Sequence, residues 1–391
     1  MSTEAVIVDV IRTPVGRGKP GGILSGIHPV DLLADVLDAL ISRNDLDPAL
    51  VDDVIGGCVS QIGEQSYNIT RNALLAAGFP DSVPGTTIDR QCGSSQQAAA
   101  FAAQAVLAGQ ADIVIACGVE SMSRVRLGSS TVGADPYGDR IRSRYPDGLV
   151  NQGVSAELIA AKWELSRAEL DDFAAHSHSL AAVAQSSGAF ASEVIPVAGV
   201  ETLTDETVRP DTSVDSLAGL KPAFRTDELA ERFPDLEWRI TPGNSSPLTD
   251  GASGALIMSA ERAEQLGFTP RARFRSFSVV GSDPMLMLTG VIPATARVLE
   301  RARLTHDDID VYEVNEAFAS VPLAWLRETG ADAAKLNSRG GAIALGHALG
   351  SSGTRLLTTL VNQLEASGGR YGLQTMCEGG GMANATIIER V

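Results

Sequence analysis

Asp112-Ile113-Val114-Ile115-Ala116-Cys117-Gly118 is a β-branched, apolar run that ends in glycine, and it predicts a buried strand. An alanine-rich segment with helical periodicity, residues 96–108, comes directly before it. The same elements appear upstream, where residues 54–59 predict a strand and residues 29–41 and 69–77 predict helices. Regular alternation of strands and helices is typical of an α/β architecture.

The C-terminal third of the chain repeats this pattern. Residues 37–55 and residues 297–312 both carry a helical stretch followed by a loop and a strand. Each region then places a reactive side chain before small residues and a helix, Cys92 in one and His347 in the other. A duplicated fold is the economical interpretation, although one such match between the halves of an α/β protein also arises by chance.

The middle of the chain, residues 119–249, breaks the alternation. It carries mixed charges, short helical stretches and an irregular segment rich in Thr, Asp and Pro at 201–217. Long insertions with little regular structure are usually functional or mobile. We therefore expect an N-terminal half over residues 1–262, with a loop domain inserted at about 119–249, and a C-terminal half over residues 270–391.

The composition describes a large acidic protein of 391 residues with a formal charge of −17. A net acidic surface repels phosphate at long range, which disfavours nonspecific binding to nucleic acid or to an anionic membrane. The N-terminus lacks a signal-peptide pattern, and no stretch approaches the roughly 18 consecutive apolar residues that cross a bilayer. Four cysteines without a Cys-x-x-Cys pair argue against disulfides and a metal site, so we expect a cytoplasmic protein.

Two of these cysteines have reactive settings. Cys92 lies in residues 89–95 (Asp-Arg-Gln-Cys-Gly-Ser-Ser), at the start of a predicted helix. Positive partial charge and free N–H groups at a helix N-terminus lower the pKa of a thiol, which makes Cys92 a candidate nucleophile. Cys377 is followed by a glutamate and three glycines, whose N–H groups can face a charged oxygen, although triple glycine alone is a weak signal. Cys58 and Cys117 lie in apolar strands, where free cysteine usually packs as a small hydrophobe.

Two further side chains are candidates for the same chemistry. His347 is embedded in glycines, and glycine lets the imidazole and its backbone approach a ligand closely. His176 and His178 are expected at the surface of a helix. Asn315 follows a predicted strand, and α/β sheets keep ligand sites at the carboxyl ends of their strands. A role for Asn315 as the cap of the next helix explains its position equally well.

Together, residues 92–95 (Cys-Gly-Ser-Ser), 315–318 (Asn-Glu-Ala-Phe), 340–347 (ending in Gly-His) and 377–381 (Cys-Glu-Gly-Gly-Gly) resemble the four active-site motifs of the thiolase family. The resemblance covers essentially the whole chain, in the same order and spacing. It implies two βαβαβαββ halves in a five-layered αβαβα core with an inserted loop domain, assembled as a homodimer or homotetramer. It also implies CoA-dependent cleavage of 3-ketoacyl-CoA, with CoA as co-substrate and no metal or other cofactor.

The resemblance further implies a role for each residue. Cys92 attacks the 3-keto carbon and holds the acyl group, while Cys377 acts first as an acid and later as a base. His347 takes the proton of Cys92 and, with a water held by Asn315, stabilises the enolate oxygen. The amides of Cys92 and Gly379 face the tetrahedral intermediate.

Contacts with CoA are expected at a second group of residues. Ser246 matches the family's serine beside the pantetheine arm. Because the protein is acidic, the phosphates need a local basic patch, which Lys221 and Arg225 supply, and Phe318 completes the predicted set. For any single arginine, a place on a solvated face is the more common explanation.

Three departures from the family pattern concern the histidine and the substrate. Ala348 stands where proline is usual, and Arg339 where asparagine is common. Asn151 and Gln152 stand where many short-chain enzymes have a methionine-glycine pair, which favours longer or bulkier acyl chains from fatty acids or sterols, as in actinobacterial degradative thiolases. A biosynthetic acetoacetyl-CoA thiolase is the alternative. A ketoacyl synthase, which needs no second acid/base thiol, and a non-catalytic acyl-CoA binding protein are remoter alternatives.

Overall fold

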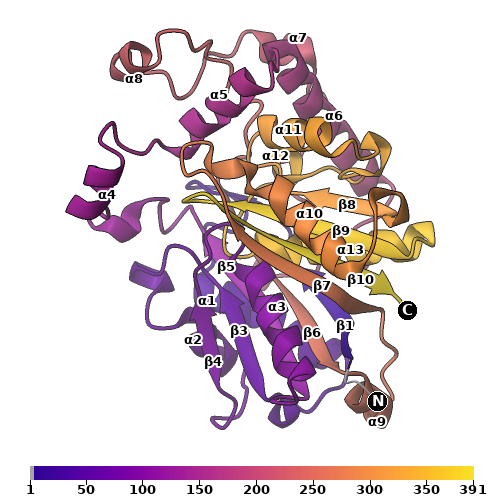
Figure 1. Ribbon diagram of the computed structural model, residues 1–391. Coiled ribbons are helices and arrows are strands. Elements are labelled where there is room, and N and C mark those ends of the chain that lie inside the picture. The colour runs from indigo at the N-terminus through magenta and orange to yellow at the C-terminus, as the bar shows by residue number, and fades with distance from the viewer. Residues whose placement is uncertain (1–3) are drawn as a thin grey trace.

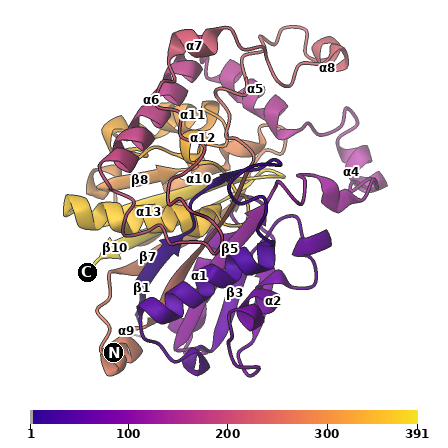
Figure 2. The same ribbon diagram turned by 180° about the vertical axis from the view of Figure 1, so that it is seen from behind.

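The computed structural model describes residues 4–391 and shows a mixed α/β fold (Figures 1 and 2). Within these residues the strands form one ten-stranded sheet in the order β4-β3-β5-β6-β1-β7-β10-β9-β8, with β2 paired to β6. The strands are β1 (Ala5–Arg12), β2 (Gly16–Arg17), β3 (Asp53–Gly57), β4 (Gly85–Ile88), β5 (Ile113–Ser121), β6 (Thr249–Ser259), β7 (Ala272–Gly281), β8 (Val311–Val314), β9 (Tyr371–Glu378) and β10 (Met382–Arg390).

The two halves of the sheet repeat one hydrogen-bonding pattern. In the first half, β4, β3 and β5 are parallel, and β6 and β1 follow as antiparallel neighbours. In the second half, β8 and β9 are parallel, and β10 and β7 follow in the same way. The halves join where β1 meets β7 over only two residue pairs, Val6 with Arg273 and Ile7 with Ala272. The predicted duplication is confirmed.

The helices are divided among the two outer layers, the central layer and the inserted region. They are α1 (Pro29–Arg43), α2 (Ile69–Ala76), α3 (Ser94–Leu107), α4 (Asp139–Arg144), α5 (Gln152–Lys162), α6 (Arg167–Ser186), α7 (Val214–Ala218), α8 (Asp227–Arg232), α9 (Ala260–Leu266), α10 (Val291–Ala302), α11 (Ser320–Thr329), α12 (Ala342–Leu345) and α13 (Ser352–Ser367). Among residues 4–391, none of these helices combines the length and the hydrophobicity needed to cross a lipid bilayer.

Local sequence signals fix several of the helix ends. Pro29 occupies the first turn of α1, where its missing N–H costs no hydrogen bond. Ser166 and Glu169 form a capping box at the start of α6. Gly330 and Gly368 end α11 and α13 in the left-handed conformation that glycine adopts without strain.

Within residues 4–391, the three largest hydrophobic clusters lie between the layers. The first packs α1 and α2 against the strands of the N-terminal half, with Leu37 and Leu74 at its centre. The second surrounds α3 and α13 between the two halves and includes Ala99 and Leu360. The third packs α10 and α11 against the strands of the C-terminal half, around Trp325. The order of these layers matches the predicted αβαβα core.

The C-terminal half departs from the predicted βαβαβαββ order at its third strand, which is reduced to one bridge between Tyr312 and Leu336. Asn337, with a φ of 44°, turns the chain away from the sheet. Its side chain continues the pairing instead, because Oδ1 accepts from Val314 N and Nδ2 donates to Val314 O, each at 2.9 Å. This exchange releases the backbone into the loop that carries His347.

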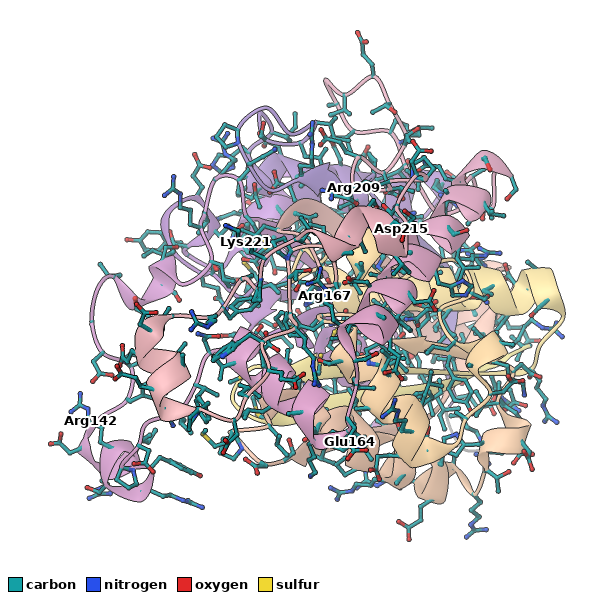
Figure 3. The ribbon with its side chains drawn as sticks, turned by 90° about the horizontal axis from the view of Figure 1, so that it is seen from above. Arg142, Glu164, Arg167, Arg209, Asp215 and Lys221 are labelled. Carbon is teal, nitrogen blue, oxygen red and sulfur yellow. The ribbon has the colours of Figure 1, made fainter. Side chains whose placement is uncertain are left out.

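The inserted region covers the C-terminal half, where α5 packs on α11 and α6 packs on α12 (Figures 1 and 2). Both ends of the span expected at 119–249 belong to the sheet, because β5 runs to Ser121 and β6 begins at Thr249. Arg167 and Lys221 in this region are labelled in Figure 3. The Arg167 guanidinium on α6 donates to the Asp171 carboxylate at 2.7 Å and to the Leu220 carbonyl at 3.0 Å. The segment that contains α4 extends away from the body (Figure 1).

Candidate active site

Cys92 lies in a tight turn that leads into α3. The Ser94 hydroxyl closes this turn, since it accepts from Arg90 N at 2.9 Å and donates to Gln91 O at 2.6 Å. Gln91 has a φ of 49°, which is uncommon for a residue with a side chain, and its N–H donates to Asp89 Oδ1 at 2.6 Å. The turn holds Cys92 at the start of the helix with only 2% of its surface exposed.

His347 precedes α13, at the corresponding place in the other half. Its Nδ1 lies 2.7 Å from the hydroxyl of Ser352, which also lies 2.8 Å from the carbonyl of Ala348. Burial, together with the positive charge of Arg355, lowers the pKa of His347 to about 3. The ring is therefore neutral near pH 7 and retains a nitrogen that accepts a proton.

Asn315 connects His347 to Cys377. Its Nδ2 lies 3.5 Å from His347 Nε2 and 3.7 Å from Cys377 Sγ. The next helix, α11, begins at Ser320 with Ala319 at its N-cap position. Asn315 therefore does not cap this helix, and the capping interpretation is wrong.

Cys92 packs beside the neighbours of both these groups. It belongs to a buried apolar cluster that includes Leu349 and Met376. Leu349 follows closely after His347, and Met376 directly precedes Cys377. The structure thus packs a thiol from the N-terminal half against residues that adjoin His347 and Cys377 in the C-terminal half.

Both thiols are held in their protonated form. The pKa of Cys92 is raised well above its ordinary value by burial, with smaller effects of Cys377 and Glu378. The expected lowering of this pKa by the helix start is wrong for the resting site, because lost hydration outweighs the favourable partial charge. Burial likewise raises the pKa of Cys377 to about 11. Each thiol therefore needs a proton acceptor before it can react.

Glu316, directly after Asn315, holds the histidine loop from one side. Its carboxylate accepts from Ser177 Oγ at 2.7 Å, from Asn337 Nδ2 at 2.8 Å and from Ile343 N at 3.1 Å. All of its oxygens face these donors in the interior, where it is 1% exposed. The contacts give Glu316 an orienting place beneath the loop.

Glu120, at the end of β5, holds the same loop from the other half of the molecule. Its buried carboxylate accepts from Val59 N at 2.9 Å, Ser60 N at 3.0 Å, Gln65 Nε2 at 2.8 Å and Gly350 N at 2.9 Å. Sequence reasoning missed this residue. The available signal was a single carboxylate at the end of an otherwise apolar strand.

Glycine lets the starts of α3 and α13 touch. A Cβ atom on Gly353 would stand 2.0 Å from Gln96 N, and one on Gly118 would stand 2.1 Å from Gly350 O. The close approach places backbone against backbone across the two halves. Any larger residue at Gly353 would push apart the helices that carry the thiol and the imidazole.

Gly379 lies beneath two glutamine side chains. A Cβ built on it would stand 2.9 Å from Gln91 Oε1 and 3.3 Å from Gln152 Nε2. Asn151, beside Gln152, caps α5 by accepting from Val154 N at 3.1 Å. Asn151 and Gln152, which replace the methionine-glycine pair, therefore have different surroundings. Asn151 is the N-cap of a helix, and the Gln152 side chain lies over Gly379.

Of the residues expected to contact CoA, Ser246, Lys221 and Arg225 belong to the inserted region, and Phe318 belongs to the C-terminal half. Ser246 Oγ donates to the Ala317 carbonyl at 3.1 Å, next to the buried Phe318. Phe318 in turn packs edge-to-face on Phe224, with ring centroids 5.8 Å apart. Lys221 and Arg225 flank Phe224 in sequence and are exposed.

Ala348 and Arg339, the two departures from the family pattern near His347, both make hydrogen bonds that anchor this part of the chain. The carbonyl of Ala348 accepts from the backbone N–H of Ser351 and of Ser352, each at 3.0 Å. The guanidinium of Arg339 donates to the Ala189 carbonyl at 3.0 Å and to the Asn362 carbonyl at 3.3 Å.

The other helical histidines differ from each other. His176 is exposed as expected, whereas His178 is buried and its Nδ1 accepts from Arg209 N at 3.2 Å. The expectation of a surface position for His178 is wrong, because α6 turns this residue toward the segment that contains Arg209. Burial lowers the pKa of His178 to about 4.

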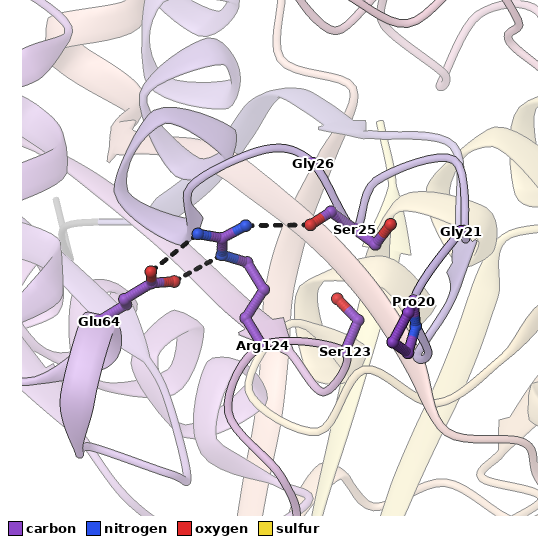
Figure 4. A pocket seen from close by; sticks show the side chains of 7 residues that line it. All are labelled: Pro20, Gly21, Ser25, Gly26, Glu64, Ser123 and Arg124. Carbon is purple, nitrogen blue, oxygen red and sulfur yellow. Dashed lines mark hydrogen bonds and ion pairs between the residues drawn. The ribbon is translucent and has the colours of Figure 1, made fainter.

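A polar surface pocket of about 420 Å³ lies elsewhere and is lined by Pro20, Gly21, Ser25, Gly26, Glu64, Ser123 and Arg124 (Figure 4). Its charges already have partners, since Arg124 pairs with Glu64 and donates to the Ser25 carbonyl at 3.0 Å. Across residues 4–391, no group of three or more His, Cys, Asp and Glu side chains is arranged to hold a metal ion.

Known proteins are similar to this chain in sequence and in fold over its whole length. The family models for the thiolase N-terminal and C-terminal domains match residues 5–261 and 268–390. A steroid 3-ketoacyl-CoA thiolase of Mycobacterium tuberculosis is 47% identical, over 100% of this chain and 95% of that protein. A 3-ketoacyl-CoA thiolase of Klebsiella pneumoniae is 43% identical, over 99% of this chain and 100% of that protein.

A solved structure gives the same answer for the fold. The acetyl-CoA acetyltransferase of Bacillus anthracis superposes with a TM-score of 0.88 at 36% identity, covering 100% of this chain and 99% of that one. The resemblance drawn from the four motifs is confirmed, and with it the prediction of an enzyme. This chain belongs to the thiolase family.

Proposed function

We propose that this chain catalyses CoA-dependent thiolytic cleavage of 3-ketoacyl-CoA through an acyl-enzyme on Cys92, in the degradation of fatty acids or sterol side chains. The observation that carries the proposal is the Asn315 amide, which contacts both His347 and Cys377 beside the buried Cys92. A nucleophile, a neutral base and a second thiol are the groups that a two-step acyl exchange requires. CoA is the co-substrate, and no metal or other cofactor takes part.

In the first half-reaction, His347 Nε2 takes the proton of Cys92, and the thiolate attacks the 3-keto carbon. The amides of Cys92 and Gly379, which donate to no other residue within the described chain, face the oxyanion. The bond between C2 and C3 breaks, and acetyl-CoA departs as an enolate that protonated His347 and a water on Asn315 stabilise. Cys377 then gives its proton to C2, and the shortened acyl group stays on Cys92.

In the second half-reaction, the Cys377 thiolate takes the proton of the CoA thiol. The CoA thiolate attacks the acyl carbon, and Cys92 leaves as a thiolate that regains its proton from His347. The shortened acyl-CoA departs, and every group returns to its starting state. Cys377 thus serves as acid and then as base, which suits a thiol whose pKa burial raises to about 11 and a neighbouring amide stabilises when ionised.

We assign CoA binding to the inserted region. Ser246 beside Phe318 takes the pantetheine arm, and the exposed Lys221 and Arg225 take the phosphates. This placement gives an acidic protein a local positive charge where a polyanionic substrate enters. The CoA KM is expected to rise when either basic residue is neutralised, with little change in kcat.

The acyl chain is expected to pass the two glutamines over Gly379. A Cβ added to Gly379 would meet the side chains of Gln91 and Gln152, so we expect these side chains to limit the space for the acyl group. The relatives named as steroid and 3-ketoacyl-CoA thiolases support a degradative role. An acetoacetyl-CoA thiolase of biosynthesis is the alternative.

We expect the chain to work as a homodimer or homotetramer in the cytoplasm. β4 lies at one edge of the sheet, and the arm around α4 carries the exposed side chains of Leu127, Val132 and Tyr137. Free strand edges and exposed apolar groups are common sites of association. Four unpaired cysteines suit a reducing compartment. Sedimentation velocity tests the assembly, because a single-chain mass would contradict it.

A panel of 3-ketoacyl-CoA thioesters, from acetoacetyl to a sterol side chain, tests the function through the loss of enolate absorbance when CoA is added. A kcat/KM that rises with acyl size supports the degradative role. The highest kcat/KM with acetoacetyl-CoA would assign the biosynthetic alternative. No CoA-dependent cleavage of any member would refute the thiolase reaction.

A further inference from the structure

The imidazole of His347 has a hydrogen-bonding side chain beside each of its two ring nitrogens. Ser352, the first residue of α13, lies 2.7 Å from Nδ1 through its hydroxyl. Asn315 Nδ2 lies 3.5 Å from Nε2. All three side chains are buried, at no more than 4% exposure. Which ring nitrogen carries the proton therefore depends on these two contacts.

The Ser352 hydroxyl has one proton, and the Ala348 carbonyl 2.8 Å away, which can only accept, is a partner for that proton. When the hydroxyl donates to that carbonyl, its oxygen acts only as an acceptor toward His347, and Nδ1 is the protonated nitrogen. Nε2 keeps its lone pair, and the N–H of Asn315 faces that lone pair. In this arrangement both contacts are satisfied by the Nδ1–H tautomer.

We propose that Ser352 is a positioning residue that holds His347 in the Nδ1–H tautomer and so leaves Nε2 unprotonated and able to take the proton of Cys92. The consequence for catalysis rests on the proposed thiolase reaction, whereas the tautomer does not. In the transfer, the S–H bond of Cys92 breaks and an N–H bond forms at Nε2, which yields a thiolate and an imidazolium. The imidazolium keeps its Nδ1–H bond to Ser352 throughout.

A competing arrangement makes the proposal testable. If Ser352 donates to Nδ1, the ring proton moves to Nε2, and the Asn315 amide must turn so that Oδ1 accepts it. Asn315 Oδ1 has no hydrogen-bond partner within the described residues, so this turn meets no obstacle from an existing bond. In that arrangement Nε2 is already protonated and cannot accept the proton of Cys92.

Nitrogen-15 NMR of the resting full-length enzyme, labelled at histidine, distinguishes the two arrangements. The chain has five histidines, and the signals missing from a His347→Asn variant identify those of His347. We expect a protonated Nδ1 and an unprotonated Nε2. A protonated Nε2 with an unprotonated Nδ1 would overturn the proposal, and this measurement needs no substrate.

Variants test the catalytic consequence. Ser352→Ala should slow acylation of Cys92 by about 10- to 100-fold, the usual cost of losing a group that orients a functional histidine, with the KM for CoA unchanged. Ser352→Thr keeps the hydroxyl and should restore most of the rate. Ser351→Ala is the matched control, because Ser351 Oγ donates to the same Ala348 carbonyl at 3.2 Å and the structure gives it no contact with His347.

The outcomes separate this proposal from the proposed function. A folded Ser352→Ala enzyme that acylates Cys92 at the wild-type rate would defeat the role of Ser352 and leave the thiolase reaction intact. A wild-type enzyme that never acylates Cys92 would defeat the reaction, while the NMR result would still decide the tautomer. If Ser352→Ala fails to fold, the NMR measurement on the wild type remains decisive.

Discussion

The starts of α3 and α13 occupy matching places in the two halves, yet they present different chemistry by different means. At α3, a short turn closed by Ser94 and strained at Gln91 presents the Cys92 thiol. At α13, a longer glycine-rich loop presents the imidazole, with Glu316 beneath it and Glu120 reaching it from the other half.

This difference shows how a duplicated scaffold acquires one function. A nucleophile needs a single atom held at a rigid point, and a short turn with its own hydrogen bonds provides that point. A base also needs a defined tautomer and a defined distance to its partner, so its loop requires anchors from outside. Neither half contains both groups, which makes the site a property of the joined molecule.

Loss of the nucleophile should give the largest effect. Cys92→Ala is expected to lower kcat by at least about 10,000-fold, because no other group can carry the acyl chain. Steady-state thiolysis measures it. Cys117→Ala is the control, since this thiol is buried in β5 and the structure places it in an apolar core. Thiolysis at even one-tenth of the wild-type rate by Cys92→Ala would place the nucleophile elsewhere.

Loosening the bridge between the halves should give the next effect. In Glu120→Gln, N–H donors that contact a carboxylate in the wild type face an amide NH2 group instead. This change should lower the free energy of unfolding by about 2–4 kcal/mol. It should also lower kcat by about 10- to 100-fold. Urea unfolding and thiolysis measure the two effects.

The control for this bridge is Glu64→Gln, which removes a carboxylate that pairs at the surface with Arg124. It should change stability by less than about 1 kcal/mol. If Glu120→Gln behaves like Glu64→Gln in both measurements, the carboxylate of Glu120 does not hold the two halves of the site in register.

The smallest predicted effect concerns pH. Burial raises the pKa of Glu378 to about 8 from an ordinary 4.5, and neither of its oxygens has a partner within residues 4–391. As pH rises through this window, the unfolded chain releases the proton while the folded chain keeps it, so stability falls. Glu378→Gln removes this pH-dependent loss. Between pH 5 and pH 8, the free energy of unfolding of the variant should therefore rise relative to that of the wild type by on the order of 1–3 kcal/mol.

Urea unfolding at the two pH values tests this prediction. Glu228→Gln, at an exposed position on α8, controls for the loss of one negative charge from the acidic protein. An equal difference between Glu378→Gln and the wild type at both pH values would contradict the raised pKa of Glu378.

The sequence was sufficient for the fold and for the family, because both follow from local patterns. The alternation around residues 96–118 and the four motifs are readable in a single pass along the chain. The acidity of Cys92 was not readable, since it is determined by burial against residues from the other half. The position of Cys92 at a helix start, taken alone, predicts a lowered pKa, whereas burial raises it.

Two further features required three-dimensional contacts. Asn337 replaces a strand by pairing its side chain with Val314, which no strand propensity predicts. Ser352 and Glu120 act on His347 and its loop, yet neither stands beside it in sequence, and their residue types are common in helices and at strand ends. Positions of this kind appear only when both partners of a hydrogen bond are known.

The most direct test is to find where the acyl group is carried when the second thiol is absent. A Cys377→Ala enzyme is incubated with a 3-ketoacyl-CoA, and peptide mass spectrometry locates the adduct. We predict an acyl thioester on Cys92 that disappears in a Cys92→Ala/Cys377→Ala double variant and forms far more slowly when His347→Asn is added. An adduct on Cys58 or Cys117, or none on any residue, would contradict a site in which Cys92 and His347 act together.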